Sequence, residues 1–290
     1  MSNVELVIDP KAKDLGDNFQ VRRALPSIKK RMIGPFIFWD HMGPVTLLND
    51  KKMTVRAHPH IGLSTITYLF TGEIMHRDSL GNEQPIRPGE VNWMTAGKGI
   101  VHSERSEAPI KGEALELEGI QLWVALPKNS EDVEPSFVHF KEESLPHIEE
   151  NGIQLRLIAG KGLGAESPVP VYSDLFYFNG RASKGKRFEM KLSSDQEGAL
   201  YVVKGKIKVE GDIHTRFSLI SFKKGTTVAF QADENSEFML FGGSVFPEKR
   251  HIWWNFVSSS KDKIEQAKDD WKNDKFPKVI NEDEVIPLPE

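Results

Sequence analysis

Two short segments of the chain each carry a pair of metal-binding side chains separated by one residue. The first pair is His58 and His60 in AHPH, and the second is His102 and Glu104 in IVHSE. Alternate residues of a β-strand project from the same face, so on two strands each pair would point one way. Imidazole nitrogens and a carboxylate bind divalent transition metals but discriminate poorly among Fe, Mn, Co, Ni, Cu and Zn. We therefore predict one metal site made of these four residues.

The alternative is that these histidines are ordinary surface or half-buried residues, as a lone HxH pair often is. Two pairs with the same spacing in a β-rich stretch favour the metal. The remaining histidines are given structural or surface roles. His139 and His147 lie in a polar linker, His76 and His214 follow turn glycines, and His251 lies in an aromatic segment near the C-terminus.

The elements that must position these pairs are short β-strands. Runs of β-forming residues separated by Gly and Pro predict an all-β barrel or sandwich; they include TITYLF at 65–70 and IQLWVAL at 120–126. A helical pattern occurs only near the C-terminus, where Ile264, Ala267 and Trp271 recur at helical spacing after serines 258–260, which offer an N-cap. We expect one C-terminal helix that packs on a barrel.

A weak internal repeat divides the chain into two similar halves. Gly72 ends the run YLFTG and Gly205 ends the run YVVKG, and the two glycines lie 133 positions apart, about one small domain. We predict two tandem β-barrel domains: a metal-binding domain over residues 1–130, a linker over 131–150, and a second domain with the C-terminal helix over 151–290.

Composition excludes several classes of protein. The chain has 290 residues and no cysteine, which excludes disulfides, thiolate metal sites and cysteine nucleophiles. A net charge of −4 gives no electrostatic case for nucleic acid or an anionic membrane, and the basic stretch 22–31 is interpreted as a solvated surface. No apolar run is long enough to cross a bilayer, and the N-terminus does not resemble a secretory signal, so we expect a cytoplasmic protein.

The same residues resemble a known family. The spacing His58-x-His60-x₄-Thr65-x₆-Gly72 is similar to the first cupin motif, with Thr65 in the place of its usual glutamate. The segment 88–102 is similar to the second cupin motif, and Glu104 restores the missing carboxylate, as in pirins. Further pirin-like segments are GPFIFWDHMGP at 34–44, AHPHIGLSTITYL at 57–69, WMTAGKGIVHSE at 93–104 and GIQLWVALP at 119–127.

The resemblance implies two tandem cupin barrels of jelly-roll type, with a metal only in the first. Its ligands would be His58, His60, His102 and Glu104, and our first choice of metal is Fe(II), with Ni, Mn, Co, Cu or Zn as alternatives. The second barrel would be metal-free because Lys191 and Ser193 occupy the places of its motif histidines.

The activity implied by pirins is that of a quercetin 2,3-dioxygenase, in which O₂ enters a flavonol, the ring opens and carbon monoxide leaves. Glu104 would be the general base that takes the flavonol proton. An aromatic substrate needs an apolar pocket, for which we select Phe38, Met94 and Trp123, although core packing explains them equally well. Asp40 and His41 could orient the ligands.

Two other functions remain open at this point. The same ligands could form a redox-sensing iron site in a regulatory protein that binds a transcription factor or an enzyme partner. The negative net charge and the lack of a basic cluster like a nuclear-localisation signal weigh against this alternative. A third possibility is a cupin isomerase or dioxygenase that acts on another small phenol or keto acid.

Overall fold

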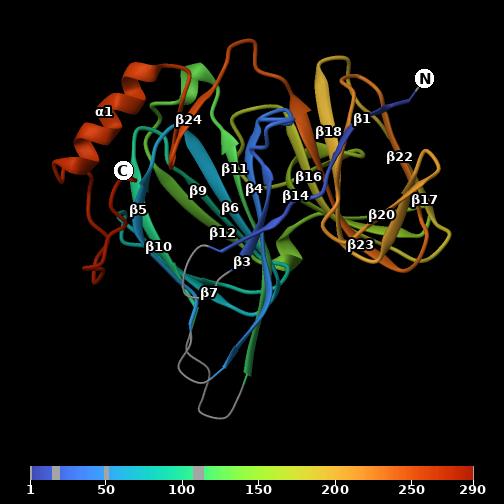
Figure 1. The fold of residues 1–290 in the computed structure, drawn as a ribbon, viewed down its shortest axis with the longest axis horizontal. Coiled ribbons are helices and arrows are strands. Elements are labelled where there is room, and N and C mark those ends of the chain that lie inside the picture. The colour runs from blue at the N-terminus through green and yellow to red at the C-terminus, as the bar shows by residue number, and fades with distance from the viewer. Residues whose placement is uncertain (1, 15–19, 49–51, 107–113, 290) are drawn as a thin grey trace. The chain divides into compact units, whose positions relative to one another are not determined.

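The computed structural model describes residues 2–14, 20–48, 52–106 and 114–289, and within them strands dominate (Figure 1). These residues form 25 strands, two short 3₁₀ helices and one α-helix, α1 (Lys261–Lys272). The chain divides into two compact units, which we call the first and second domains. The first contains Lys13–Val21, Trp39–Lys141 and Pro247–Glu290, and the second contains Met1–Ala12, Arg22–Phe38 and Glu142–Phe246. The all-β prediction is confirmed.

The first domain is built mainly on two sheets. The larger has the order β12-β9-β6-β11-β4-β3-β2 and the smaller the order β5-β10-β7-β8. The larger sheet contains β2 (Ala12–Asp14), β3 (Gln20–Leu25), β4 (Phe36–Leu48), β6 (Leu63–Thr71), β9 (Val91–Thr95), β11 (Ala114–Ala125) and β12 (Ser136–Phe140). The smaller contains β5 (Thr54–His60), β7 (Ile74–Asp78), β8 (Glu83–Ile86) and β10 (Ile100–Arg105).

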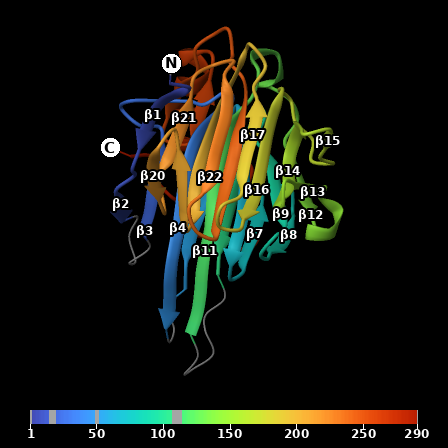
Figure 2. The same cartoon turned by 90° about the vertical axis from the view of Figure 1, so that its right-hand side faces the viewer.

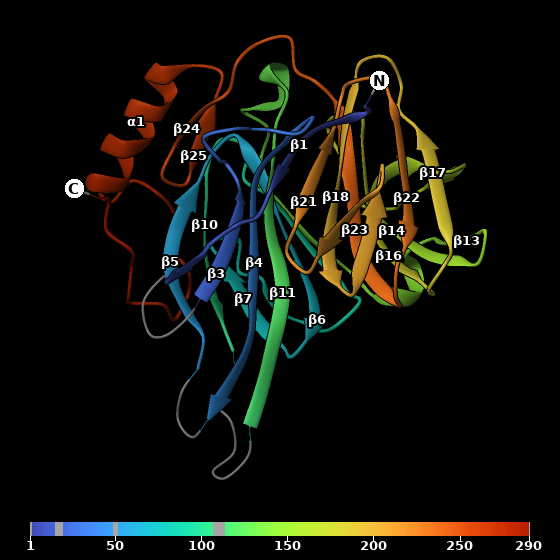
Figure 3. The ribbon, with the colours of Figure 1, turned by 45° about the vertical axis from the view of Figure 1, so that its right-hand side comes forward.

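Strands β5 and β10 carry the two predicted ligand pairs, and they are hydrogen-bonded neighbours (Figure 3). His58 of β5 lies opposite His102 of β10 in the register. The two predicted ligand pairs are therefore on directly adjacent strands. The register shifts between His102 and Glu104, where β5 has an irregularity. At this irregularity the backbone of Ala57 is hydrogen-bonded to the C-terminal tail. Its N–H donates to Glu284 O at 3.2 Å, and its carbonyl accepts a hydrogen bond from the Ile286 N–H at 2.9 Å.

The second domain also has two sheets. Figure 2 shows β14 and β16 of the larger sheet and β17 and β22 of the smaller one. The larger runs β1-β21-β18-β23-β16-β14-β13, with β15 beside β14, and the smaller runs β17-β22-β19-β20. Their bounds are β1 (Val4–Ile8), β13 (His147–Glu150), β14 (Ile153–Gly162), β15 (Ala165–Glu166), β16 (Leu175–Ala182), β17 (Arg187–Lys191), β18 (Gln196–Lys204), β19 (Lys206–Val209), β20 (Asp212–Thr215), β21 (Leu219–Phe222), β22 (Thr227–Ala232) and β23 (Ser236–Ser244).

Hydrocarbon fills the core of the second domain. Phe178, Leu200, Phe238 and Leu240 belong to one cluster of buried apolar side chains from both sheets. Burial of this much apolar surface stabilises the domain, because each fully buried Leu or Phe contributes about 1.5–3 kcal/mol. Among the described residues, both groups of side chains with metal-binding geometry lie in the first domain.

The C-terminal helix forms as predicted but belongs to a different domain from the one predicted. We assigned residues 151–290 to one domain, whereas β24 (His251–Trp253), β25 (Phe256–Ser258) and α1 pack on the first domain, beside β5 (Figure 1). The physical reason is apolar contact: Ile264 and Ala267 of α1 form a buried cluster with Ile61 and Phe256. Ser260 occupies the N-cap position, without a side-chain capping hydrogen bond.

The predicted linker is partly structured within the first domain. Residues 136–140 form β12, which pairs with β9, and the side chain of Glu131 is buried and accepts hydrogen bonds from Ser258 and Ser259. In the described part of the chain, no helix is long and apolar enough to cross a membrane.

Candidate metal centre

Three neighbouring strands of the smaller sheet direct polar side chains toward the larger sheet. In β5 and β10 these are the predicted pairs, and β7 adds a third pair with the same spacing, His76 and Asp78. His102 lies opposite Asp78 and Glu104 lies opposite His76 in the register. Contacts to Thr67 of β6, Trp123 of β11 and Phe137 of β12 place the cluster between the two sheets.

The three histidines selected from the sequence meet at one point. One ligand nitrogen from each of His58, His60 and His102 lies within 4.8 Å of the other two, and all three side chains are buried. His60 Nε2 and His102 Nε2 are 3.1 Å apart. The structure thus brings these three residues together; their role as ligands stays a prediction.

Hydrogen bonds fix the orientation of two of the rings. His58 Nδ1 donates to the carbonyl of Arg56 at 2.8 Å, and His60 Nδ1 donates to the carbonyl of Asn255 at 3.0 Å. A histidine that donates from Nδ1 has its lone pair on Nε2, which is the tautomer needed to bind a metal through Nε2. The Asn255 carbonyl comes from the turn between β24 and β25, so the C-terminal segment helps to orient a candidate ligand.

The protonation states also fit a metal. Burial lowers the pKa of His58 to about 4, and it lowers the pKa of His60 and of His102 well below the usual value. The three rings are therefore neutral at pH 7 without a bound ion, and no proton must leave them before a metal binds. Three neutral imidazoles that converge through nitrogen are a suitable donor set for a divalent transition metal.

Glu104 does not join the group of His58, His60 and His102; its carboxylate groups instead with His76 and His102, so His102 is shared between the two groups. Burial raises the pKa of the Glu104 carboxyl. Thr67 Oγ1 lies 3.0 Å from Glu104 Oε1 and 2.7 Å from Gln121 Oε1. A hydroxyl has only one hydrogen, so a protonated Glu104 can donate to Thr67 while Thr67 donates to Gln121. The site can therefore hold Glu104 as a neutral acid as well as a carboxylate.

Sequence reasoning missed His76, which we assigned a structural role because it follows a turn glycine. The side chain is buried, its Nδ1 lies 3.4 Å from His102 Nδ1, and its Nε2 lies 3.0 Å from Asp78 Oδ2. The signal that could have found it is the spacing His76-x-Asp78, which repeats that of the two recognised pairs.

Two of the three predicted pocket residues, Met94 and Trp123, lie on one face of the larger sheet, and Phe38 lies elsewhere. The Trp123 ring packs edge-on against His60, with ring centroids 5.1 Å apart. Met94 and Trp123 lie opposite Thr65 on its two sides in the sheet, so the three residues share one face. Phe38 lies in the first three residues of β4, which are grouped with the second domain while the rest of the strand is grouped with the first, and the Arg23 guanidinium lies 4.4 Å from the centre of its ring. Its role in a pocket stays a prediction.

The sequence also offers Asp40 and His41 as residues that could orient the ligands. Both are buried, and His41 Nε2 lies 2.8 Å from Glu118 Oε1 on β11. The groups that contact Nδ1 of the candidate ligand rings in the structure are Arg56 O, Asn255 O and His76 Nδ1, and an orienting role for Asp40 and His41 stays a prediction.

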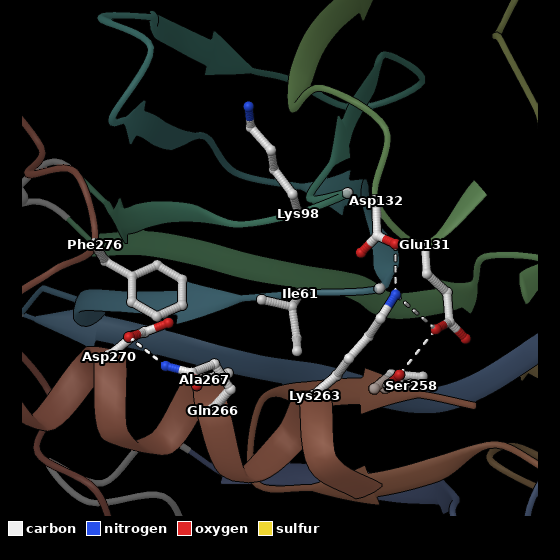
Figure 4. Close-up of a pocket in the computed structure, with 13 residues that line it drawn as sticks. Ile61, Lys98, Glu131, Asp132, Ser258, Lys263, Gln266, Ala267, Asp270 and Phe276 are labelled. Carbon is white, nitrogen blue, oxygen red and sulfur yellow. Dashed lines mark hydrogen bonds and ion pairs between the residues drawn. The ribbon is translucent and has the colours of Figure 1, made fainter. Parts of the chain in front are cut away.

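A cavity of about 190 Å³ lies between α1 and the residues that follow β5, the strand that carries His58 and His60 (Figure 4). Ile61, Ala267 and Phe276 line it, and Lys263 extends from α1 toward Asp132. Successive residues of an extended chain face opposite sides, so Ile61 faces this cavity while His60 faces the other histidines. The cavity is therefore separate from the candidate metal centre.

Fold and site together define a two-domain cupin protein with a histidine-rich candidate metal centre in the first domain. Comparison with known proteins specifies the family. The Pirin family model matches residues 18–124, and the model of the pirin C-terminal cupin domain matches residues 177–277. The chain belongs to the pirin family.

Relatives match this chain over nearly its full length. A "Pirin-like protein" of Caulobacter vibrioides is 49% identical, covering 99% of this chain and 100% of its own. A Pseudomonas aeruginosa protein named "Putative quercetin 2,3-dioxygenase" is 36% identical, and the match covers 91% of this chain and 82% of that protein's length. The crystal structure of a quercetin 2,3-dioxygenase from Acinetobacter baumannii is 32% identical with a TM-score of 0.90, covering 98% of this chain and 95% of its own.

Proposed function

We propose that this protein is a metal-dependent dioxygenase that opens flavonols such as quercetin. The metal would be one divalent ion, with Fe(II) as first choice, held by His58, His60, His102 and Glu104. The observation that carries the proposal is the convergence of three buried, neutral imidazoles, one of which, His102, is also grouped with the buried Glu104 carboxyl. The names of the Pseudomonas and Acinetobacter relatives support the choice of reaction.

A bound divalent metal supplies a Lewis acid that lowers the pKa of the flavonol 3-hydroxyl. Glu104 would then accept the hydroxyl proton as general base. Its environment suits that role, since a base works best when its pKa lies closer to the working pH than that of an exposed carboxylate, and burial raises the pKa of Glu104 in this direction. The resulting flavonolate is electron-rich and supplies the electrons for its reaction with O₂.

Side chains of the larger sheet would position the substrate. Trp123 and Met94 offer apolar surface on the sheet that faces the histidines, and Thr67 holds the Glu104 carboxyl in place by a hydrogen bond. An aromatic ring stacked in an apolar site excludes water from the flavonolate, which strengthens the electrostatic interactions that hold it.

The test is a flavonol assay on protein with known metal content. Protein loaded with Fe(II), and separately with Ni(II), is mixed with quercetin while O₂ uptake and the flavonol absorbance are recorded. We expect O₂ consumption with loss of the flavonol band and release of carbon monoxide, and none of these with chelated protein. Full metal occupancy without O₂ uptake would refute the proposal and favour a regulatory role. O₂ uptake with other phenols alone would indicate a different substrate.

A further inference from the structure

We propose that His76 and Asp78 are positioning residues that hold His102 in the tautomer and orientation needed to bind the metal. This inference rests on the proposed metal site, but it does not depend on the identity of the substrate. The three residues form a buried chain, Asp78–His76–His102, that ends at the point where the three histidines meet.

The two nitrogens of His102 face different neighbours. Nε2 lies 3.1 Å from His60 Nε2, on the side of the three-histidine cluster, and Nδ1 lies 3.4 Å from His76 Nδ1. One ring cannot direct both nitrogens to a single ion, so His102 can join His58 and His60 only through Nε2. Its Nδ1–H then needs an acceptor, because an unpaired buried N–H group costs about 1–3 kcal/mol.

His76 is placed to be that acceptor. Its Nε2–H donates to Asp78 Oδ2 at 3.0 Å, which leaves the lone pair on Nδ1, the atom that faces His102. The carbonyls of Arg56 and Asn255 give His58 and His60 the same support. Each candidate ligand ring therefore has an acceptor at Nδ1, and only for His102 is that acceptor a second side chain.

The far end of the chain is rigid. Asp78 Oδ1 accepts hydrogen bonds from the backbone N–H groups of Leu80 and Asn82, at 2.9 and 3.1 Å, and the Asn82 amide donates to both carboxylate oxygens. The His76 ring stacks on Phe137, with centroids 4.4 Å apart and the planes 13° from parallel. These contacts fix the His76 ring, so its Nδ1 is held toward His102 before any ion binds.

A rival arrangement is a second ion bound by His76, His102 and Glu104, whose ligand atoms also lie within 4.8 Å of one another. The two arrangements exclude each other, because the Nδ1 lone pair of His76 cannot accept the His102 proton and bind an ion together. They also differ in stoichiometry. The positioning role predicts one ion per chain, whereas the rival predicts two.

Three substitutions of His76 separate its two contacts. In His76→Asn the amide oxygen can replace Nδ1 as acceptor for His102, while the bond to Asp78 is lost. In His76→Gln the longer side chain reaches Asp78 instead, and the acceptor for His102 is lost. His76→Phe keeps the ring that stacks on Phe137 but removes both bonds. His214→Phe, in β20 of the second domain, is the matched control.

Zn(II) affinity is measured by competition with a chelator, and the metal content per chain is determined by elemental analysis. We expect Zn(II) to bind about 10–100-fold more weakly to His76→Phe and His76→Gln than to wild type, as for other losses of a ligand's hydrogen-bond partner. His76→Asn should recover most of the affinity, and His214→Phe should leave it unchanged. In the Zn(II) form of wild type, ¹⁵N NMR of the imidazoles should show His102 protonated at Nδ1.

Equal affinities for the Phe, Gln and wild-type proteins would overturn the proposal, as would two Zn(II) ions per chain or an unprotonated Nδ1 on His102. If His76→Phe does not fold, the comparison of the Asn and Gln variants still decides. None of these readouts uses catalysis. A wild-type protein that binds one Zn(II) with the predicted dependence on His76, but whose Fe(II) form ignores quercetin, would refute the proposed activity alone.

Discussion

Replacing Glu282 by glutamine should loosen the C-terminal tail from the reverse side of the ligand strand β10. The Glu282 carboxylate accepts hydrogen bonds from Ser103 Oγ at 3.0 Å and from Arg105 Nε at 2.9 Å, and its side chain is only 5% exposed. Ser103 lies between His102 and Glu104 in the chain. The same carboxylate thus fixes the tail and the strand that carries two proposed ligands.

The structure sets the size of the effect. Hydrogen bonds to charged groups contribute about 1.5–3 kcal/mol, and glutamine keeps one acceptor oxygen, so we expect a loss of about 2 kcal/mol. For domains of 150–250 residues this corresponds to a fall in Tm of about 4–8 °C.

The effect should depend on pH in a defined direction. The hydrogen bond from Arg105 lowers the pKa of Glu282 from the ordinary value of 4.5. The stabilisation by Glu282 is therefore complete above that ordinary value, and it is lost as the pH falls through the lowered pKa. The difference between wild type and Glu282→Gln should shrink over the same range.

The assay is thermal unfolding followed by circular dichroism, on metal-free protein between pH 7 and pH 3. Glu284→Gln is the matched control, because the Glu284 side chain is 66% exposed and its oxygen lies 3.5 Å from Arg105. Exposed substitutions of this kind change stability by about 0.5 kcal/mol or less. Equal Tm values for wild type and Glu282→Gln at pH 7 would refute the reasoning, and so would a difference that persists undiminished at pH 3.

Three further predictions concern the site and its support. His102→Ala should lose the metal, as measured by elemental analysis, while His214→Ala keeps it; full occupancy in His102→Ala would exclude His102 as a ligand. Glu104→Gln should keep most of the metal but lose turnover in the quercetin assay, because the amide cannot accept a proton; normal turnover would show that Glu104 is not the base. Gly62→Ala should lower the free energy of unfolding by about 1–3 kcal/mol in denaturant titrations, because its Cβ would lie 2.0 Å from Val257 O at a backbone φ of +67°. An unchanged midpoint would mean that β25 shifts without cost.

Much of the fold could be predicted from the sequence because its signals are local. Alternating β-forming runs and turn glycines mark strands wherever they occur, and the apolar spacing of Ile264, Ala267 and Trp271 marks a helix. The domain that α1 covers could not be predicted in this way. That choice depends on contact with Ile61, which is about 200 positions away in the chain.

Local sequence is enough to identify the side chains that are able to bind a metal and the strand faces from which they project. His58, His60, His102 and Glu104 stand out because a spacing of two residues on a strand fixes a common direction. The spacing does not specify which other strands lie beside these two.

The orientation and the protonation state of the histidine rings depend on tertiary structure alone. It brought the carbonyl of Asn255 to His60 from 195 positions away and His76 to His102 from 26 positions away. It also placed Glu104 against Thr67, in a region dry enough to raise the pKa of the carboxyl. The physical reason is that hydrogen-bond partners and dehydration depend on the strands that pair across long stretches of chain, and local sequence does not encode that pairing.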